Sequence, residues 1–271
     1  MLSPILQSKY QALVALVRDL RRVIVAFSAG IDSTLVLKVA LDTLGAEHVL
    51  AATGVSPSLA ARELQSVNEL AKLLGAPLEL AETSELDDRN YAANPANRCY
   101  YCKNELYTRL TELARTRGYF AIVNGVNLDD QGDYRPGLAA AKEWSVRAPL
   151  HETGMTKAEV RSLAQHLGLP NWQKPALACL SSRIPYGTPV TIASLSQIEQ
   201  AEEFLYERGF QNFRVRHHVK LARIEVQPQD LARLLVEPLR SDLIGHFKQL
   251  GYTYITLDLQ GFRSGSGNEV L

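Results

Sequence analysis

A short run of small, hydroxylated residues is the first part of this 271-residue chain that could do chemistry. The run Ser28–Ser33 (SAGIDS) follows the apolar segment 23–27 and opens a helical pattern at 34–44. At a junction of strand and helix, the first N–H groups of the helix lack carbonyl partners and the helix dipole adds partial positive charge. Phosphate oxygens bind at such junctions. We therefore favour nucleotide binding over the alternative, an ordinary strand, turn and helix N-cap.

The run differs from the two common phosphate-binding loops, Gly-x-x-x-x-Gly-Lys-Ser/Thr and Gly-x-Gly-x-x-Gly. It resembles the pyrophosphate loop, Ser-Gly-Gly-x-Asp-Ser, of the ATP pyrophosphatase superfamily. Members of that superfamily cleave ATP to AMP and pyrophosphate while they adenylate a substrate oxygen. Ala29 stands where the superfamily has its first glycine. A methyl group therefore lies where the backbone can require a positive φ or a close approach to phosphate.

Three cysteines are the second candidate for chemistry. Cys99 and Cys102 lie three residues apart at an expected helix start, so they share a face and feel the N-terminal dipole, which favours thiolates. Cys179 lies in the Pro-, Ser- and Gly-rich segment 175–189, which we expect to be an ordered active-site connection. Three thiolates together could hold an iron–sulfur cluster and leave one iron open to sulfide. The residues leave three alternatives open: a zinc site with His151, a redox Cys-x-x-Cys pair with an unrelated third thiol, or three buried cysteines.

Composition and charge exclude several partner classes. Lys and Arg number 29 and Asp and Glu number 29, so the formal net charge is zero and nothing draws the whole chain to nucleic acid or to an anionic membrane. Residues 1–20 mix apolar with charged side chains and lack both a signal-peptide core and a charge-free span. We expect a cytoplasmic protein without nucleic-acid or membrane partners. In a reducing cytosol, three cysteines do not form a disulfide framework.

Alternating strand and helix patterns predict a doubly wound parallel α/β sheet, which positions these residues. The expected strands are residues 23–27, 48–55, 77–81, 120–124 and 145–148, and the expected helices are 2–20, 34–44, 59–74, 99–117 and 156–167. In such a sheet, ligands bind beyond the carboxyl ends of the strands. Ser28, Val55, Asn124 and Gly125 would emerge there.

A second, smaller α/β domain is expected after the connection, so the predicted domains are 1–189 and 190–271. Its expected elements are a helix at 191–208, strands at 213–217, 221–226 and 254–259, and helical patterns at 230–235 and 240–250. The Ser- and Gly-rich tail 264–267 is expected to be flexible and disordered at its end. His217 and His218 are adjacent on a strand and therefore point to opposite sides, which argues against one shared metal and for structural roles.

Five strings of residues, read together, resemble the LarE family. They are 26–33, Asn97–Lys103 (NRCYYCK), Asp133–Gly137 (DYRPG), Cys179–Gly187 (CLSSRIPYG) and Phe213–Arg216 (FRVR). LarE proteins are ATP-dependent sulfur transferases that make the nickel-pincer nucleotide cofactor of lactate racemase. The resemblance covers residues 13–265, and the DYRPG and SSRxPYG strings are far more specific than the loop. The family also implies a homo-oligomer, a hexamer.

The resemblance implies a two-step reaction on a small nucleotide. A carboxylate of pyridinium-3,5-biscarboxylic acid mononucleotide is adenylated, and sulfur then displaces AMP to give a thiocarboxylate. Some members give up the sulfur of a single cysteine, whereas members with three cysteines use a cluster or a persulfide and turn over repeatedly. Cys99, Cys102 and Cys179 place this chain in the second group, with a [4Fe–4S] cluster held by three cysteines and sulfide on the open iron.

The resemblance also implies roles for individual residues. Seven are implied to contact ATP, with Asp32 also helping to hold Mg²⁺: Ser28, Gly30, Asp32, Ser33, Lys103, Asn124 and Gly125. Three arginines are implied to bind the phosphate and carboxylates of the substrate, because a guanidinium makes two-point contacts with either anion: Arg183, Arg214 and Arg216. Glu202 matches a family carboxylate that assists proton transfer or binds metal. The alternatives are an exposed strand face for Arg214 and Arg216 and a solvated helix glutamate for Glu202.

Two rival functions use the same residues. A transfer RNA thiolation enzyme can combine a pyrophosphate loop with three cluster-binding cysteines. Such an enzyme should carry a basic stripe, which a neutral chain of this size lacks. The other rival is a non-catalytic nucleotide-binding or zinc-stabilised domain, which Ala29 in the loop suggests.

Overall fold

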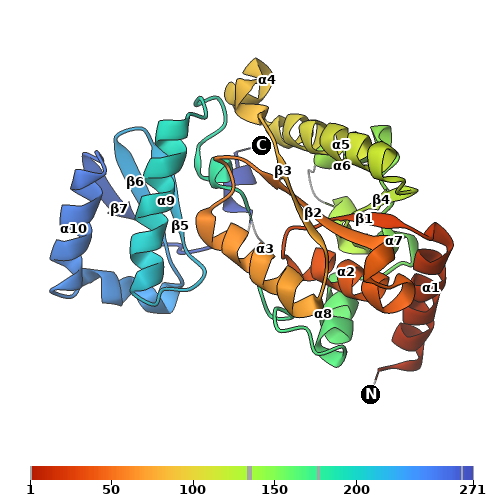
Figure 1. Cartoon of the computed structure of the whole chain (residues 1–271). Coiled ribbons are helices and arrows are strands. Elements are labelled where there is room, and N and C mark those ends of the chain that lie inside the picture. The colour runs from red at the N-terminus through yellow and green to blue at the C-terminus, as the bar shows by residue number, and fades with distance from the viewer. Residues whose placement is uncertain (1, 133–135, 176–177, 264, 271) are drawn as a thin grey trace. The chain divides into compact units, whose positions relative to one another are not determined.

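The computed structural model describes residues 2–132, 136–175, 178–263 and 265–270 and divides the chain into two compact units (Figure 1). The first unit comprises 1–56, 61–85 and 97–175, and the second comprises 57–60, 86–96 and 176–271. The longest stretch of the second unit is 176–271, whereas the predicted second domain is 190–271. The second unit also includes two short segments from the N-terminal part of the chain.

The first unit is a parallel sheet with helices on both faces. Its elements are α1 (Pro4–Leu20), β1 (Val23–Ala26), α2 (Ile31–Leu44), η1 (Ala46–His48), β2 (Val49–Val55), α3 (Ala61–Leu74), β3 (Leu78–Glu82), α5 (Arg98–Arg117), β4 (Ala121–Val123), η3 (Leu128–Gly132), α6 (Gly137–Glu143), α7 (Pro149–Glu152) and α8 (Lys157–His166). The strand order is β3-β2-β1-β4 and every pairing is parallel. This arrangement confirms the predicted α/β class.

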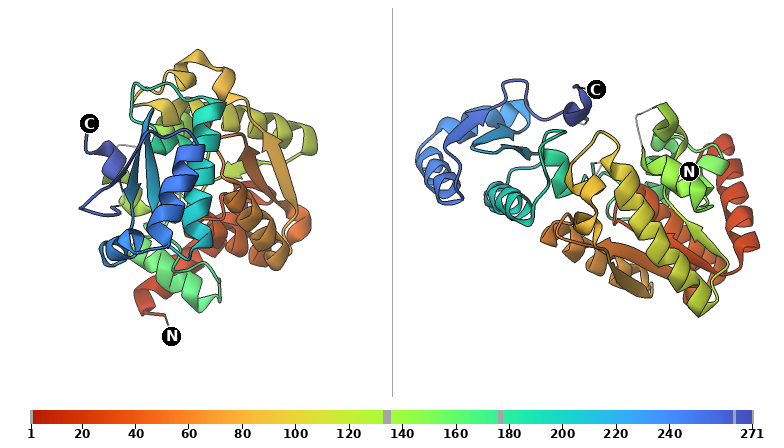
Figure 2. Two further views of the ribbon diagram at one scale, coloured as in Figure 1. Left: turned by 90° about the vertical axis from the view of Figure 1, so that its left-hand side faces the viewer. Right: turned by 90° about the horizontal axis from the view of Figure 1, so that it is seen from above.

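Burial on both faces explains why β1 is a continuous apolar run. Val23 and Val25 pack in one cluster with residues of α1, α2 and α8, whereas Ile24 packs in another with residues of α5 and α6. Figures 1 and 2 show these two groups of helices on opposite sides of the sheet. Both clusters hold β1 at the centre of the sheet, so the loop that follows β1 starts from a rigid element.

One strand prediction in this unit is wrong. Residues 145–148 form no ladder with β4, and a single parallel bridge joins Arg147 to Val123. Ser145 has a φ of 53°, which turns the chain directly after α6. Pro149 then begins α7, because proline at the first helical position loses no hydrogen bond. The turn at Ser145 and the start of α7 at Pro149 leave too few residues between them for a strand.

The second unit contains a three-stranded sheet of order β5-β6-β7, antiparallel and then parallel. Its helices and strands are α4 (Arg89–Ala92), η4 (Leu180–Arg183), α9 (Ile192–Glu207), β5 (Arg214–His218), β6 (Leu221–Glu225), η5 (Pro228–Leu235), α10 (Leu239–Gln249), β7 (Tyr254–Leu257) and η6 (Ser266–Asn268). One sheet face, with Val215, Ala222 and Ile224, packs against α9 and α10. The other carries Arg214 and Arg216. The short element η2 (Glu85–Asp87) lies where the chain passes between the two units.

The helical pattern predicted at 230–235 lies within a 3-10 helix, η5. One prediction in the second unit needs correction. The tail is ordered at Gly265–Gly267, because Ser266 is buried and its hydroxyl bonds the guanidinium of Arg216 at 2.6 Å. Ser264 lies outside the described residues. Among the helices that the structure describes, none is long and apolar enough to cross a membrane.

Candidate functional site

The loop between β1 and α2 contains Ala29 at the position where the superfamily has a glycine. Ala29 is buried and has a φ of 56°, a region that costs an L-residue about 1–2 kcal/mol but a glycine nothing. The departure from the superfamily pattern thus lies where glycine is most useful. The side chain of Asn171 supports this turn by donating to the carbonyl of Ala29 at 3.1 Å and to Thr34 Oγ1 at 2.9 Å.

The start of α2 keeps its N–H groups available to an anion. Within the described part of the chain, no side chain caps the helix at its N-cap residue Gly30. The hydroxyls of Ser28 and Ser33 lie 3.1 Å apart, and Ser33 Oγ also donates to the Gly30 carbonyl at 3.0 Å. The two hydroxyls therefore lie beside the backbone N–H donors at the start of α2, as the sequence predicts. We call this group of donors the cradle.

Gly125 approaches this cradle from the end of β4. A Cβ atom built on Gly125 would lie 2.6 Å from the backbone nitrogen of Ser33 and 2.9 Å from the carbonyl carbon of Asp32. Only glycine fits there without displacing the helix start. The neighbouring Asn124 donates its N–H to Arg147 O and accepts from the N–H of Val126. The structure thus places Asn124 and Gly125 beside the loop.

We expect the Gly125→Ala substitution to lower the free energy of unfolding by about 1–3 kcal/mol, because the added methyl group overlaps backbone atoms. Urea unfolding measures the change. The matched control is Gly245→Ala on α10, where no atom lies within 4 Å of the new Cβ. In a helix this control should be neutral or stabilising by up to about 1 kcal/mol. Equal stability of the two variants would contradict the close approach.

Asp32, which the resemblance assigns to Mg²⁺ and phosphate, has two side-chain partners. Its Oδ1 accepts from Asn127 Nδ2 at 3.1 Å, and its Oδ2 forms an ion pair with the ammonium of Lys157 at the start of α8. The backbone N–H of Lys157 in turn donates to Asp129. Sequence reasoning missed Lys157 and Asn127. The cluster of Asn and Asp that follows β4 was the only local signal, and Lys157 gave none.

The start of α5 carries two cysteines and Lys103. Cys99 is exposed, Cys102 is half-buried, and both lie among the first five residues of α5, at the helix start as predicted. The side chain of Lys103 packs against Gly137 at the start of α6, where a Cβ would lie 3.0 Å from Lys103 Cγ. Asp133 and Arg135 of the DYRPG string lie outside the described residues.

The exposure of the cysteines excludes one of the alternatives for their role. All three are thiols rather than disulfides, and Cys99 and Cys179 are exposed, so the hypothesis of three buried cysteines is wrong. In the ranges that the structure describes, no three His, Cys, Asp or Glu side chains form a metal-binding group, and Cys99, Cys102 and His151 of the first unit are included in that finding. Cys179 belongs to the second unit. The gathering of the three thiols stays a prediction.

The loop that carries Cys179 is wrapped around a buried guanidinium. Arg183 Nη1 donates to the carbonyls of Ala178 and Cys179 at 2.6 and 2.8 Å. Its Nε and Nη2 make a two-point contact with Glu202 at 2.9 and 2.8 Å. The Arg183 side chain is 3% exposed and that of Glu202 1%. Glu202 also accepts from the N–H of Val215 at 3.1 Å, so the interpretation of Glu202 as a solvated glutamate is wrong.

Hydroxyl groups fix the other side of this loop. Ser181 Oγ lies 2.7 Å from Tyr91 Oη and 3.1 Å from Ser58 Oγ, and Tyr91 and Ser58 are 2.8 Å apart. Asn94 donates its side-chain amide to the carbonyls of residues 184, 185 and 188. The short segments 57–60 and 86–96 therefore hold residues 181–188 of the predicted connection 175–189 in place. Their role could not be predicted, because the partners lie about 90 residues apart in the chain.

Arg214 and Arg216 lie on one face of β5, as their spacing predicts. Arg216 makes a two-point contact with Glu225 at 2.9 and 3.0 Å, and its Nη1 donates to Ser182 O at 2.9 Å. It is buried, so the exposed-face alternative is wrong for this residue. Arg214 is half-buried and lies over the ring of Phe262, with 5.1 Å between guanidinium and ring centre. Two arginines, Arg183 and Arg216, thus hold the backbone of residues 178–182.

The charges on this face shift the pKa of a neighbouring histidine. The pKa of His218 lies below its ordinary value because burial disfavours the cation, with Arg223 and Arg216 adding repulsion. The lowered pKa favours the neutral form of His218 at pH 7. The guanidinium groups of this face lie beside the carboxylates of Glu225 and Asp258, which balance part of their charge.

Comparison with known proteins identifies the family. The chain is 46% identical over 266 residues to an uncharacterised protein of Synechocystis sp., covering 98% of this chain and 99% of that one. It is 42% identical over 266 residues to the pyridinium-3,5-bisthiocarboxylic acid mononucleotide synthase of Lactiplantibacillus plantarum, covering 98% and 96%. An uncharacterised protein of Methanocaldococcus jannaschii is 29% identical over 246 residues, covering 90% and 92%. No protein-family model matches the chain. Because the likeness to the synthase extends over almost the whole of both chains, the protein belongs to the LarE family of sulfur transferases.

Proposed function

We propose that this protein is an ATP-dependent sulfur transferase that acts on pyridinium-3,5-biscarboxylic acid mononucleotide in biosynthesis of the nickel-pincer nucleotide cofactor. The observation that carries the proposal is the cradle at the start of α2, where, among the described residues, no side chain caps the helix at Gly30 and the hydroxyls of Ser28 and Ser33 lie 3.1 Å apart. This cradle fits phosphate oxygens. The chain that contains it is 42% identical to a synthase of the bisthiocarboxylic acid.

In the first step, a carboxylate oxygen of the substrate attacks the α-phosphorus of ATP. The bond from the α-phosphorus to the bridging oxygen breaks, and pyrophosphate leaves. The N–H groups of the cradle and the ammonium of Lys157 are placed to bind the departing phosphates, and Lys103 is a further phosphate contact. Asp32 has the oxygen ligands that Mg²⁺ prefers, and the ion would neutralise phosphate charge.

In the second step, a sulfur nucleophile attacks the acyl carbon and AMP leaves. The substrate needs cationic groups that hold its phosphate and carboxylates during this exchange. Arg214, half-buried on β5, is the best placed to contact them, with Arg183 and Arg216 beside it in our assignment. Glu202 and Glu225 fix the orientation of Arg183 and Arg216 through two-point contacts.

The sulfur reaches the acyl carbon through the three cysteines in our proposal. A [4Fe–4S] cluster held by Cys99, Cys102 and Cys179 would supply an open iron that binds sulfide. The helix dipole at the start of α5 favours the thiolate ligands Cys99 and Cys102.

Pyrophosphate release tests the proposal. The purified protein is incubated with ATP, Mg²⁺ and the pyridinium dicarboxylate nucleotide, and pyrophosphate is measured enzymatically. We expect release that depends on this substrate and stays at background with bulk transfer RNA in its place. Release with RNA alone would favour the RNA-thiolating alternative. Absence of release with either would support a non-catalytic nucleotide-binding domain.

A further inference from the structure

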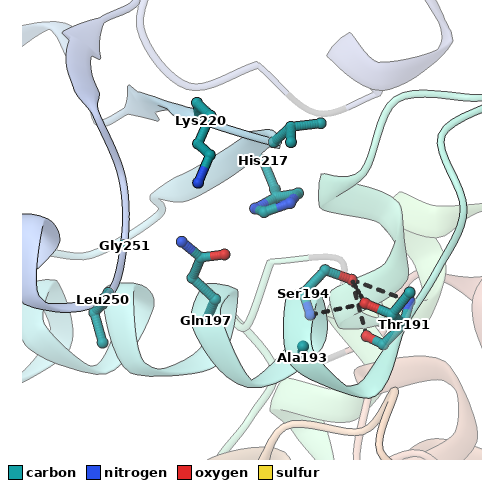
Figure 3. A pocket seen from close by; sticks show the side chains of 9 residues that line it. Thr191, Ala193, Ser194, Gln197, His217, Lys220, Leu250 and Gly251 are labelled. Carbon is teal, nitrogen blue, oxygen red and sulfur yellow. Dashed lines mark hydrogen bonds between the residues drawn. The ribbon is translucent and has the colours of Figure 1, made fainter.

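A cavity in the second unit lies apart from every residue that we assign to sulfur transfer. Its volume is about 320 Å³, and its walls come from the first turns of α9, the turn between β5 and β6, and the end of α10 (Figure 3). Val219 and Leu250 are apolar residues among its lining. The remaining walls are rich in hydrogen-bond donors.

Three polar side chains from three different elements line the cavity. Gln197 comes from α9, His217 from β5 and Lys220 from the β5–β6 turn. Figure 3 shows the Lys220 ammonium and the Gln197 amide approaching from opposite sides, with the ring of His217 beside them. Among the described residues, the protein supplies no hydrogen-bond partner to the Gln197 amide, the Lys220 ammonium or His217 Nε2. These groups are available to a ligand.

The hydrogen bond at Nδ1 of His217 determines whether Nε2 carries the ring proton and can donate to a ligand in the cavity. His217 Nδ1 lies 3.2 Å from the hydroxyl of Tyr252, and both side chains are buried. Burial, with a smaller contribution from Glu202, raises the pKa of Tyr252, so the phenol keeps its proton. In the described part of the chain His217 Nδ1 is the only partner of this hydroxyl. We assign the hydroxyl as the donor, because a buried hydroxyl proton would otherwise have no acceptor. In this assignment the ring proton lies on Nε2.

The electrostatics of the cavity favour an anion. Burial, with repulsion from His218, lowers the pKa of His217, so its Nε2–H is a neutral donor at pH 7. Lys220 adds a positive charge, and the N-terminal end of the 16-residue helix α9 adds a favourable dipole. Glu202, the carboxylate whose charge acts on Tyr252, is compensated by its two-point contact with Arg183.

We propose that this cavity binds a small organic anion. Its phosphate or carboxylate oxygens accept hydrogen bonds from His217, Gln197 and Lys220, and its apolar body lies on Val219 and Leu250. The site goes beyond the proposed reaction, because it shares no residue with the α2 cradle, the cysteines or the arginines. It also gives His217 a binding role where the sequence indicates a structural one.

Nuclear magnetic resonance of the full chain labelled with ¹⁵N-histidine tests the site. The signals of His217 are assigned by their loss in His217→Gln, and phenyl phosphate and benzoate are titrated as separate probes. We expect a saturable shift of the His217 signals with at least one probe, and the tighter probe shows whether the site prefers phosphate or carboxylate. Because the readout is local, binding of a probe at the α2 cradle does not imitate it.

Lys220→Gln should raise the dissociation constant about tenfold, since it removes a charge-assisted hydrogen bond. Gln197→Ala should also weaken binding. The matched control is Lys72→Gln on α3, which removes the same charge from an exposed helix position and should leave the dissociation constant unchanged. Absence of a saturable His217 shift with both probes, or equal affinities in Lys220→Gln and Lys72→Gln, overturns the proposal.

Discussion

The Arg183→Met substitution is expected to lower the free energy of unfolding by about 3–5 kcal/mol. It leaves the Glu202 carboxylate, 1% exposed, charged and without its two-point partner. It also removes the donor that holds the carbonyls of Ala178 and Cys179. Urea unfolding followed by circular dichroism measures the loss.

Two further variants separate the buried charge from other effects. The double variant Arg183→Met/Glu202→Leu should recover most of the stability, because an apolar pair of similar volume replaces the ion pair. Arg109→Met on α5 breaks an exposed ion pair with Glu105 and should cost less than about 1 kcal/mol. If Arg183→Met were no more destabilising than Arg109→Met, the buried pair would not hold the loop as described.

Alanine substitution of any one of the three cysteines is expected to reduce thiocarboxylate formation to below about one thousandth, since each removes a ligand or carrier of the sulfur. Pyrophosphate release should persist in Cys99→Ala, Cys102→Ala and Cys179→Ala, because adenylation needs no sulfur. The assay is run anaerobically with mass spectrometry of the product. Ser162→Ala on the exposed face of α8 is the control and should keep full activity.

Metal analysis of the same proteins gives an independent readout. Anaerobically prepared protein should contain iron and acid-labile sulfide, and each cysteine variant should lose both. Zinc in place of iron, or a cysteine variant that keeps both iron and sulfur transfer, would contradict the three-cysteine assignment.

Local patterns were sufficient to predict the fold class and the nucleotide loop. The apolar run 23–27 predicts a strand buried on both faces, and the helical period after it predicts α2. The prediction for the tail failed because its partner is distant in the chain. The tail 264–267 has a flexible composition, yet Ser266 is buried by a bond to Arg216, 50 residues earlier in the chain. A pattern of neighbouring residues cannot predict a contact with a residue so far away in the chain.

The candidate site shows the same division. Asp32 could be identified from the loop motif, whereas its partner Lys157 lies 125 residues further along the chain and has no motif of its own. Arg183 and Glu202 were identified through family resemblance, but their mutual contact became evident only in the fold. Residue types thus indicate the chemistry, and long-range packing decides which groups share a hydrogen bond.

The most direct test of the account measures the products of one reaction mixture. Protein prepared anaerobically is incubated with ATP, Mg²⁺, sulfide and pyridinium-3,5-biscarboxylic acid mononucleotide. The nucleotides are then separated, and their masses are measured by mass spectrometry. The account predicts a product in which sulfur replaces a carboxylate oxygen, with one AMP and one pyrophosphate formed for each sulfur incorporated. Sulfur incorporation without ATP, or pyrophosphate release without any sulfur-containing product in the unsubstituted protein, would contradict it.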